Sequence, residues 1–274
     1  MLREPLPLRE ARMPRFAVEL ARTAADVRAA QRLRYAVFAE EMGARLDAPE
    51  AGIDADRFDP HCEHLVVREA ARGEIVGTYR ILSPSAAARA GGYYSEQEFD
   101  LARLAPLRAG LVEVGRSCIH PGYRTGAVIS LLWAGLARYM LAHRHAHLMG
   151  CASIGMADGG YAAAAMYRRI AAAALSPAEY RVVPRHALPL ERLTAEAPAE
   201  PAPLIKGYLR LGAWVCGAPA WDPAFNTADL LVLLPLARLD ARYARRYIGA
   251  DVVRVPAAPC GAGARLHSAG PRGA

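Results

Sequence analysis

The sequence predicts a mixed α/β fold, and two patterns in its first half support this prediction. A strand pattern over 111–119, a glycine-containing turn, an amphipathic helix over 126–143 and an apolar strand over 148–154 follow in the order of a βαβ unit. Two strand patterns, 64–68 and 75–82, precede this unit and are joined by a short turn, as in a hairpin. We therefore expect one sheet with helices packed on it.

The other elements follow from periodicity and turn residues. Between residues 23 and 42, apolar side chains recur three and four positions apart, which predicts a helix with one buried face. Further expected elements, in chain order, are an acidic loop (47–59), a polar glycine-marked insertion (90–100), a helix (161–174), a linker rich in Pro, Ala and Glu (194–203) and a strand (230–234).

The chain is expected to form one compact domain over residues 15–249. Residues 1–14 are charged and contain prolines, so we expect a flexible arm there. Residues 250–274 end in a stretch rich in Gly, Ala and Pro and are predicted to be a disordered tail. The linker near residue 200 leaves a two-lobed arrangement as the alternative.

The charge of the chain restricts its partners. The formal net charge is +7, and almost all of it comes from arginine, because Lys206 is the only lysine. Such a surplus suits acidic partners. No lysine run, zinc-finger spacing or aromatic RNA-binding pattern favours nucleic acid, so we expect no nucleic-acid partner. An acidic carrier protein and an anionic membrane surface remain as candidates.

Hydropathy and cysteine usage favour the cytoplasm. No stretch approaches the roughly 18–20 unbroken apolar residues of a membrane span, and residues 1–14 lack the apolar segment of a secretory signal. The five cysteines are scattered without CxxC spacing, which fits a reducing compartment. We expect a cytoplasmic protein, with at most peripheral contact at the inner face of the cytoplasmic membrane.

The predicted strand 111–119 contains two charges that an apolar strand seldom holds. Glu113 and Arg116 are three positions apart, so a regular strand would point them to opposite faces. Gly115 lies between them and is a place for a bulge that would turn both toward one cleft. A buried carboxylate is costly without a partner or a function. The alternatives are a functional pair and an ion pair on a solvated edge.

The turn before the predicted helix 126–143 is a candidate phosphate site. The first N–H groups of a helix lack internal partners and carry partial positive charge. Gly126 would let a phosphate approach the backbone, Thr125 precedes it, and Arg124 adds a charged donor fork. These groups suit the phosphate of phosphopantetheine. A plain tight turn is the alternative.

A second group of charges comes from three segments. Asp54, Asp56 and Asp59 lie within six residues, while Arg34 belongs to the first helix and Arg80 to the second strand. The glycine and the terminal glutamate of a calcium-binding loop are absent, so we expect no metal at these aspartates.

Eight ordered segments together resemble the bacterial L-ornithine Nα-acyltransferases over roughly residues 25–249. These enzymes make lyso-ornithine lipid from a 3-hydroxyacyl carrier protein and ornithine. Their fold is similar to that of the GCN5-related N-acetyltransferases, a mixed and mainly antiparallel sheet flanked by helices, and they are distant relatives of the acyl-homoserine-lactone synthases. The segments are 34–43, 56–64, 77–80, 94–100, 113–118, 150–153, 206–213 and 225–229.

The distant similarity to lactone synthases implies functional positions one residue at a time. Arg34 and Phe38 resemble an arginine and a phenylalanine on a helix of those synthases. Asp56 and Asp59 resemble their paired aspartates, and Arg80 resembles an arginine on one of their strands. Their Glu-x-x-Arg resembles Glu113 and Arg116. Those synthases also have a tryptophan between the Phe and the first Asp, and this chain has none there. This departure counts against S-adenosylmethionine use and lactone formation.

The resemblance implies N-acylation by the acyl-carrier thioester, with no bound cofactor and no covalent enzyme intermediate. Glu113 is the expected general base for the attacking amine, directly or through a water. An arginine (Arg34, Arg80 or Arg116) would hold the ornithine carboxylate, and Asp56 or Asp59 the distal ammonium. A backbone N–H near 117–119 would bind the thioester oxygen. The domain 15–249 would then be the acyltransferase domain.

Other interpretations stay open beside this one. Cys118 or Cys151 with His64 or His120 would make a nucleophilic pair, but isolated buried cysteines are usually small apolar residues. The histidines at 143, 145 and 147 suggest a metal site, yet they stand at a helix end where cations suit the dipole. A lactone synthase and a non-catalytic module binding carrier protein or membrane are the alternative functions.

The histidines also predict where the pathway stops. A complete ornithine lipid carries a second chain, esterified to the hydroxyl of the first, and O-acyltransferases of that type use an H-x-x-x-x-D motif. None of the eight histidines is followed by aspartate at the fifth position. We therefore expect N-acylation only, with a separate O-acyltransferase acting downstream.

Overall fold

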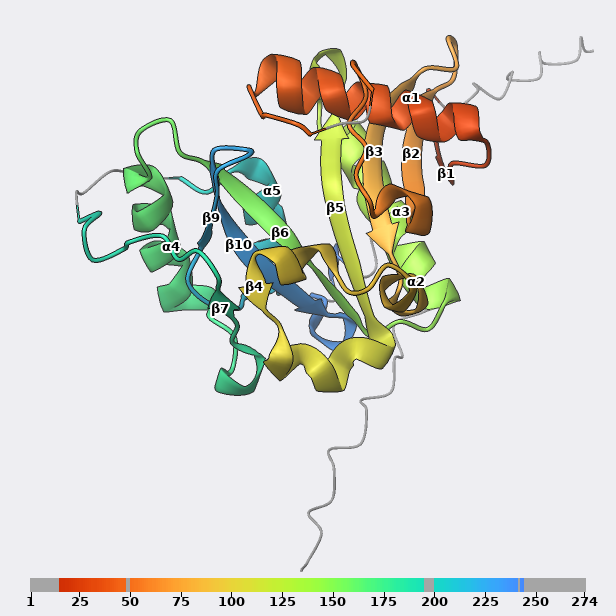
Figure 1. The fold of residues 1–274 in the computed structure, drawn as a ribbon. Coiled ribbons are helices and arrows are strands. Elements are labelled where there is room, and N and C mark those ends of the chain that lie inside the picture. Colours follow the sequence, from red (N-terminus) through yellow and green to blue (C-terminus); the bar gives the residue numbers. More distant parts are fainter. Residues whose placement is uncertain (1–14, 48–49, 195–199, 241, 244–274) are drawn as a thin grey trace, which may run out of the picture.

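A computed structural model describes residues 15–47, 50–194, 200–240 and 242–243 and shows one central sheet (Figure 1). Eight strands form it in the order β1-β2-β3-β5-β6-β10-β8, with β9 also paired to β10. The strands are β1 (Phe16–Leu20), β2 (Glu63–Glu69), β3 (Ile75–Leu82), β5 (Leu111–Ile119), β6 (His147–Gly155), β8 (Trp214–Val215), β9 (Ala220–Asp222) and β10 (Thr227–Pro235), and a separate small sheet pairs β4 (Phe99–Asp100) with β7 (Val183–Pro184).

Only one neighbouring pair in the central sheet is parallel. β5 and β6 run side by side with α3 as their crossover, whereas the other ladders of the sheet are antiparallel. The βαβ unit and the hairpin predicted from the sequence are thereby confirmed, as is the mixed, mainly antiparallel sheet. The strands after the predicted linker join the same sheet through the β6–β10 ladder.

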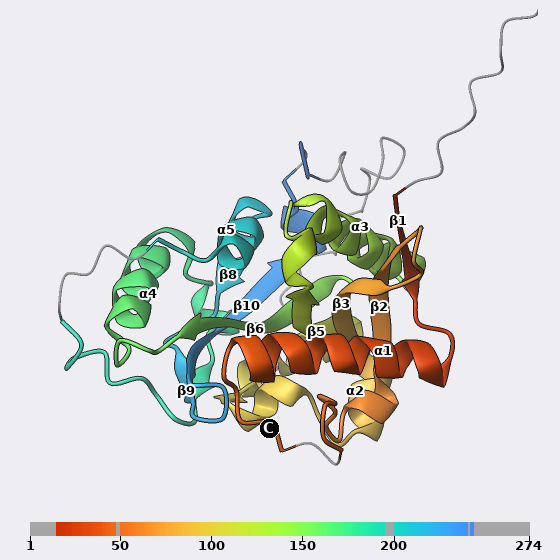
Figure 2. The same ribbon diagram turned by 90° about the horizontal axis from the view of Figure 1, so that it is seen from above.

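Helices cover both faces of the sheet (Figure 2). α1 and α2 lie on one face, and α3 and α5 on the other. Thr23 caps α1 by accepting from the Asp26 N–H, while Asp26 accepts from the Thr23 N–H, so the helix starts at a reciprocal capping box. The helices are α1 (Ala24–Tyr35), α2 (Pro84–Arg89), α3 (Ala127–Ala142), α4 (Tyr161–Ala174) and α5 (Pro203–Arg210), and α1 continues as a π-helical turn (Ala36–Glu41).

Each face of the sheet has its own apolar core. On the α3 face, Val112 and Val114 of β5 pack with Leu132 of the helix. On the opposite face, Leu111 of β5 belongs to a cluster with Met149 and Phe99. Alternate residues of a strand point to opposite faces, so β5 divides the two cores. Glu113 shares the parity of Leu111 and therefore points to the α1 and α2 face.

Some expectations concern residues that lie outside the described ranges. These are the arm 1–14, the tail 250–274, the last residues of the predicted domain (244–249) and part of the linker (195–199). Within the described ranges, none of the helices combines the length and the apolar character needed to cross a membrane.

Candidate active site

The site lies where two parallel strands separate. β5 and β6 are paired only from Leu111 to Glu113 on one side and from His147 to Met149 on the other, and both strands continue beyond the ladder. Just past the ladder the backbones are very close, because a Cβ on Gly150 would lie 2.3 Å from the Val114 carbonyl oxygen. Farther along, the strands diverge and leave an opening in the sheet (Figure 1).

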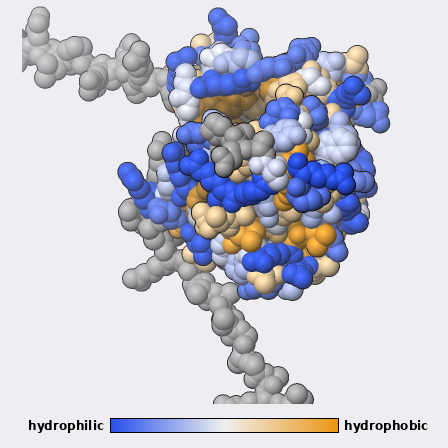
Figure 3. Space-filling view, turned by 90° about the vertical axis from the view of Figure 1, so that its left-hand side faces the viewer, coloured by the Kyte–Doolittle hydropathy of each residue, from blue (hydrophilic) through white to orange (hydrophobic). Residues whose placement is uncertain are grey.

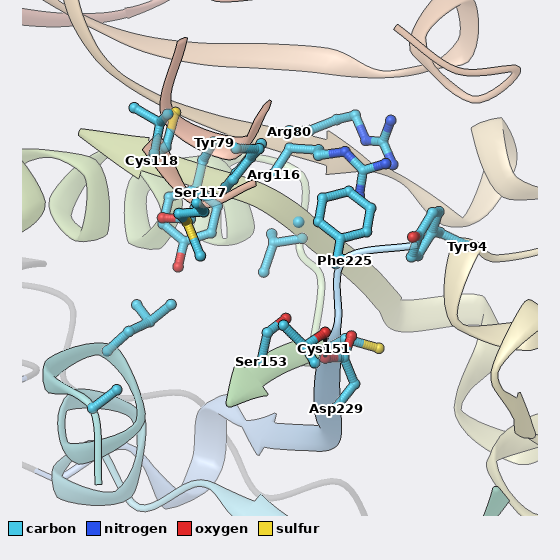
Figure 4. Close-up of a pocket in the computed structure, with 18 of the residues that line it drawn as sticks. Tyr79, Arg80, Tyr94, Arg116, Ser117, Cys118, Cys151, Ser153, Phe225 and Asp229 are labelled. Atoms are coloured by element: carbon cyan, nitrogen blue, oxygen red, sulfur yellow. Dashed lines mark hydrogen bonds between the residues drawn. The ribbon is translucent and has the colours of Figure 1, made fainter. Parts of the chain in front are cut away.

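A cavity of about 460 Å³ fills this opening. A hollow with hydrophobic residues inside it and hydrophilic residues above it is visible in Figure 3. Figure 4 shows the side chains of the cavity: Arg116, Ser117 and Cys118 come from β5, and Cys151, Ser153 and Asp229 come from β6 and β10 on the other side. The opening therefore has one wall that contains arginine and another that contains a carboxyl group.

A bulge in β5 places Glu113 and Arg116 on the same face. The β3–β5 register shifts between Thr78, which faces Cys118, and Arg80, which faces Gly115. Arg116 adopts a left-handed backbone conformation (φ 50°), which is unusual for a residue other than glycine. The predicted bulge exists, but it lies one residue after Gly115.

Glu113 is enclosed by hydrogen-bond donors. Its carboxylate accepts from the Tyr94 N–H at 2.6 Å, from the Ser95 N–H at 2.8 Å, and from the Ser95 hydroxyl. The residue is only 4% exposed, yet it lines the cavity. Burial raises the pKa of Glu113, and the bonds from Ser95 and Tyr94 oppose that rise. The carboxyl group thus holds the 94–95 turn and also borders the reaction space.

The three aspartates and three arginines form one buried charge network. Arg34, which is fully buried, donates to Asp54 at 2.8 Å and to both oxygens of Asp59 at 2.9 and 3.0 Å. Arg80 donates to Asp56 at 2.7 Å and to Asp59 at 3.0 Å. Desolvation raises the pKa of Asp59, but the opposing effects of Arg34 and Arg80 together leave it well below its usual range. These aspartates are neutralised from within the protein.

This network bears on the expected roles of three residues. Arg34, Asp56 and Asp59 do not line the cavity, and their charges are used by one another. Arg34 is enclosed by Asp54 and Asp59, and aspartates that each bind arginine are poor ligands for a substrate ammonium. The substrate-binding roles of Arg34, Asp56 and Asp59 stay predictions, whereas Arg80, Arg116 and Phe38 line the cavity.

Arg116 is the arginine best placed to meet an anionic substrate group. Its guanidinium lies 5.0 Å from the Tyr94 ring centroid and 4.8 Å from that of Phe225. Asp54 lies 3.2 Å from its Nε and Asp56 lies 3.3 Å from its Nη2. The aromatic faces fix the plane of the guanidinium, and the edge formed by Nη1 and the second hydrogen of Nη2 is the one that can make bidentate bonds to a carboxylate.

The predicted phosphate site is only partly on the cavity. Arg124 lines the cavity, but its guanidinium is bound by both oxygens of Glu41 at 2.6 and 2.7 Å. Gly126 caps α3 with φ 87°, and Thr125 precedes it; neither lines the cavity. Gly126 supplies no side-chain hydrogen bond to the first turn of α3.

Sequence reasoning missed the acidic wall of the cavity. Asp229 and Ser153 were seen only as parts of the resemblance and received no role, and Cys151 was considered only as a nucleophile. Asp229 is 4% exposed within β10. The signal that identified Glu113, a carboxylate in an apolar strand, would also have identified Asp229, but the predicted strand began at Leu230 and left it outside.

Cys118 and Cys151, the two cysteines considered as nucleophiles, lack the lowered pKa of a reactive thiol. Burial raises the pKa of Cys118 to about 12 and that of Cys151 well above its ordinary value, so both thiols stay protonated. In the described ranges, one cluster has the spacing of a metal site, namely Glu98, Cys151 and Asp229, and it does not include the histidines at 143, 145 and 147. His143 and His145 instead stack near the end of α3.

The comparisons place the chain in a class and then in a family. Residues 33–134 match the acetyltransferase (GNAT) domain model, and together with the opened mixed sheet this defines an N-acyltransferase of the GNAT fold. The L-ornithine N(alpha)-acyltransferase of Rhizobium meliloti (strain 1021) is 39% identical over 264 residues, which cover 89% of this chain and 87% of that protein. The corresponding protein of Brucella abortus (strain 2308) is 38% identical over 86% of this chain and 90% of its own length. The chain belongs to the L-ornithine N(alpha)-acyltransferase family.

Among solved structures, the acyl-homoserine-lactone synthase LasI superposes with a TM-score of 0.49 at 14% identity and covers 88% of this chain and 98% of LasI.

Proposed function

We infer that this chain transfers a fatty acyl group to the α-amino group of L-ornithine, the first step of ornithine lipid synthesis. Membership of the family over most of the chain is the observation that carries this function. We further propose that the donor is a 3-hydroxyacyl thioester on the phosphopantetheine of acyl carrier protein. The separation of β5 and β6 supports this part, because an extended thioester needs such an opening to reach a buried acceptor site.

The reaction is a direct transfer. The unprotonated α-nitrogen attacks the thioester carbonyl, a C–N bond forms, the C–S bond breaks, and the pantetheine sulfur leaves as a thiolate that takes up a proton. Glu113, directly or through a water, accepts the proton that the amine loses, and burial, which raises its pKa, makes it a stronger base than an exposed carboxylate. A backbone N–H of β5 near Ser117–Ile119 stabilises the developing oxyanion.

Arg116 holds the carboxylate of the amino acid in this proposal. It lies on the same face of β5 as Glu113 and beside Tyr94 and Phe225, so it fixes the α-carbon next to the proposed base. Arg80 contributes positive charge from the adjacent strand, and Phe38 adds an apolar edge to the cavity.

The function is tested with purified protein, 3-hydroxyacyl carrier protein and L-ornithine, with products read by mass spectrometry. We expect the mono-acylated α-amide and no two-chain lipid, because no histidine in the chain begins an H-x-x-x-x-D motif. The two-chain lipid should appear only after a separate O-acyltransferase is added. Formation of the two-chain lipid by this protein alone would contradict the restriction to N-acylation, and the absence of any N-acyl ornithine would contradict the proposed function.

Arg124 offers a second prediction, which concerns the donor. If Arg124 binds the pantetheine phosphate together with the Gly126 end of α3, Arg124→Gln should raise the KM for acyl carrier protein several-fold more than the KM for ornithine. The difference should shrink at high ionic strength, because Arg124 is exposed. Steady-state kinetics at two salt concentrations measure it.

The matched control is Glu41→Gln, which removes the partner of Arg124 and frees its guanidinium. We expect this variant to keep or lower the donor KM. If Glu41→Gln and Arg124→Gln weaken donor binding equally, Arg124 serves the ion pair with Glu41 and does not bind phosphate.

We also propose that the protein works in the cytoplasm, with peripheral contact to the anionic inner face of the cytoplasmic membrane. The net charge of +7 supports this proposal, since it favours both an acidic carrier protein and anionic lipid. Sedimentation with anionic and with neutral vesicles tests it, and equal binding to both would count against an electrostatic contact.

A further inference from the structure

Two acidic side chains from distant segments meet beside the cavity. Glu98 precedes β4, and Asp229 is the third residue of β10. Ligand atoms of Glu98, Asp229 and Cys151 lie within 4.8 Å of one another. Asp229 lines the cavity and accepts from the Thr227 hydroxyl at 2.8 Å. Glu98 does not line the cavity itself, and both of its carboxylate oxygens are inaccessible to solvent and lie beside Asp229 and Cys151, which separate it from the cavity.

Within the described ranges, no ion pair or hydrogen bond joins a basic side chain to Glu98 or Asp229. Asp229 and Asp222 repel the negative charge of Glu98. The arginines of the site face Asp54, Asp56 and Asp59, on the other side of the cavity. Burying two carboxyl groups without a cation is unfavourable unless they share a proton or bind one. The acidic wall thus lacks the positive charge that the aspartate network has.

We propose that Glu98 and Asp229 form the subsite for the distal ammonium group of the amino-acid acceptor. This inference rests on the proposed function and adds to it the feature that selects a diamino acid over a neutral one. Figure 4 shows Asp229 beside Cys151 and Ser153, with Arg116 on the opposite side of the cavity. An acceptor with its carboxylate at Arg116 and its ammonium at Asp229 is held at both ends.

Holding both ends also determines which nitrogen reacts. The distal amine is kept protonated by two carboxylates and cannot attack a thioester. The α-amine, next to the carboxylate bound by Arg116, lies near Glu113. A neutral side chain of the same length would leave the buried carboxyl pair without a partner, and sites of this kind reject such analogues strongly.

The titration of the pair agrees with this role. Burial first, and then the charge of Asp229, raise the pKa of Glu98 to about 9, and burial raises the pKa of Asp229 as well. In the absence of a cation the two groups therefore retain a proton near neutral pH. Binding of the ammonium requires the pair to lose that proton, so ornithine should bind better as pH rises toward 9.

The test compares L-ornithine with L-norvaline, the acid of the same length without the distal amine. For the full chain we expect Glu98→Gln and Asp229→Asn each to reduce the ratio of kcat/KM for ornithine over norvaline at least about tenfold. Glu74→Gln is the matched control, because it removes one negative charge at the exposed β2–β3 turn, outside the cavity. It should leave the ratio unchanged.

A measurement on the unaltered protein covers the case in which the variants fold poorly. With each KM expressed as the concentration of amino acid that has a free α-amine, the ratio of KM values for norvaline over ornithine should increase several-fold from pH 6 to pH 9, because the titration of Glu113 is common to both reactions and cancels. A ratio that is independent of pH, together with unchanged ratios in both variants, would overturn the subsite.

A divalent cation is the rival ligand for this cluster, since Glu98, Cys151 and Asp229 have suitable spacing. Loss of ornithine acylation on treatment with EDTA, with recovery on adding Zn²⁺, would overturn the ammonium subsite. If the unaltered protein acylates neither amino acid when supplied with active donor, the proposed function itself fails. That outcome differs from acylation of both amino acids without preference, which overturns only the subsite.

Discussion

Replacing Glu113 by glutamine is expected to lower kcat by about 10²- to 10⁴-fold, the usual contribution of a general base. Glutamine keeps the size of the side chain but cannot take the proton that the amine must lose. In the unaltered protein kcat/KM should rise with pH both because Glu113, whose pKa is raised by burial, loses its proton and because the α-amine does, and only the rise due to the amine should remain in the variant. Rapid-mixing kinetics with acyl carrier protein and ornithine across pH 6–9 measure both effects.

Glu113 also supports the 94–95 turn, so the experiment needs a control for structure. A glutamine amide can present its oxygen to only one of the Tyr94 and Ser95 N–H groups, because they bond different carboxylate oxygens, and its NH₂ then faces the other donor. Ser95→Ala removes one donor while leaving the carboxylate in place. Suppose that Ser95→Ala lowers turnover as much as Glu113→Gln does, and that both variants keep the pH profile of the unaltered protein. Glu113 is then a positioning residue and not the base.

The sequence predicted most of the fold because its main elements have strong periodicity. The bounds of β3, β5 and α4 coincide with the predicted segments, and the βαβ unit dictated the single parallel pair. β1 was missed, since five residues at a sheet edge give little pattern and gain their stability from pairing with β2. The π-helical end of α1 has the same apolar spacing as a regular helix and could not be distinguished from one.

The candidate site was predicted less completely, because a sequence shows charges but not which of them pair. Glu113 stood out as a carboxylate in an apolar strand, and the structure places it on the cavity. Asp56 and Asp59 looked equally available for a substrate ammonium until the structure showed Arg34 and Arg80 bound to them. The opposite wall, with Asp229, depends on β10 lying beside β6, a pairing between segments far apart in the chain.

Replacing Arg34 by methionine is expected to reduce the free energy of unfolding by about 3–5 kcal/mol, the usual cost of removing one partner from a buried ion pair. Methionine keeps much of the apolar stem but leaves Asp54 and Asp59 without the donors that now lie 2.8–3.0 Å away. Chemical denaturation at pH 7 measures the change. Arg28 of the same helix, which forms an exposed pair with Glu50 of the following loop, provides the matched control, and Arg28→Met should change the free energy by less than about 1 kcal/mol.

The pH dependence separates lost charge pairing from lost packing. In the folded protein the pKa of Asp59 is lowered by Arg34 and Arg80, so its contribution to stability is present above the unfolded value of 3.8 and is lost as pH falls through the lower folded value. Arg34→Met should make the pKa of Asp59 less low. The difference in free energy of unfolding between the variant and the unaltered protein should therefore become smaller in acid. Adding Asp59→Asn to Arg34→Met should recover part of the lost stability at pH 7, since it removes a carboxylate that has lost one of its two arginines. If the difference in free energy of unfolding stays constant down to pH 3, and the double variant recovers no stability, Arg34 stabilises the fold through packing alone.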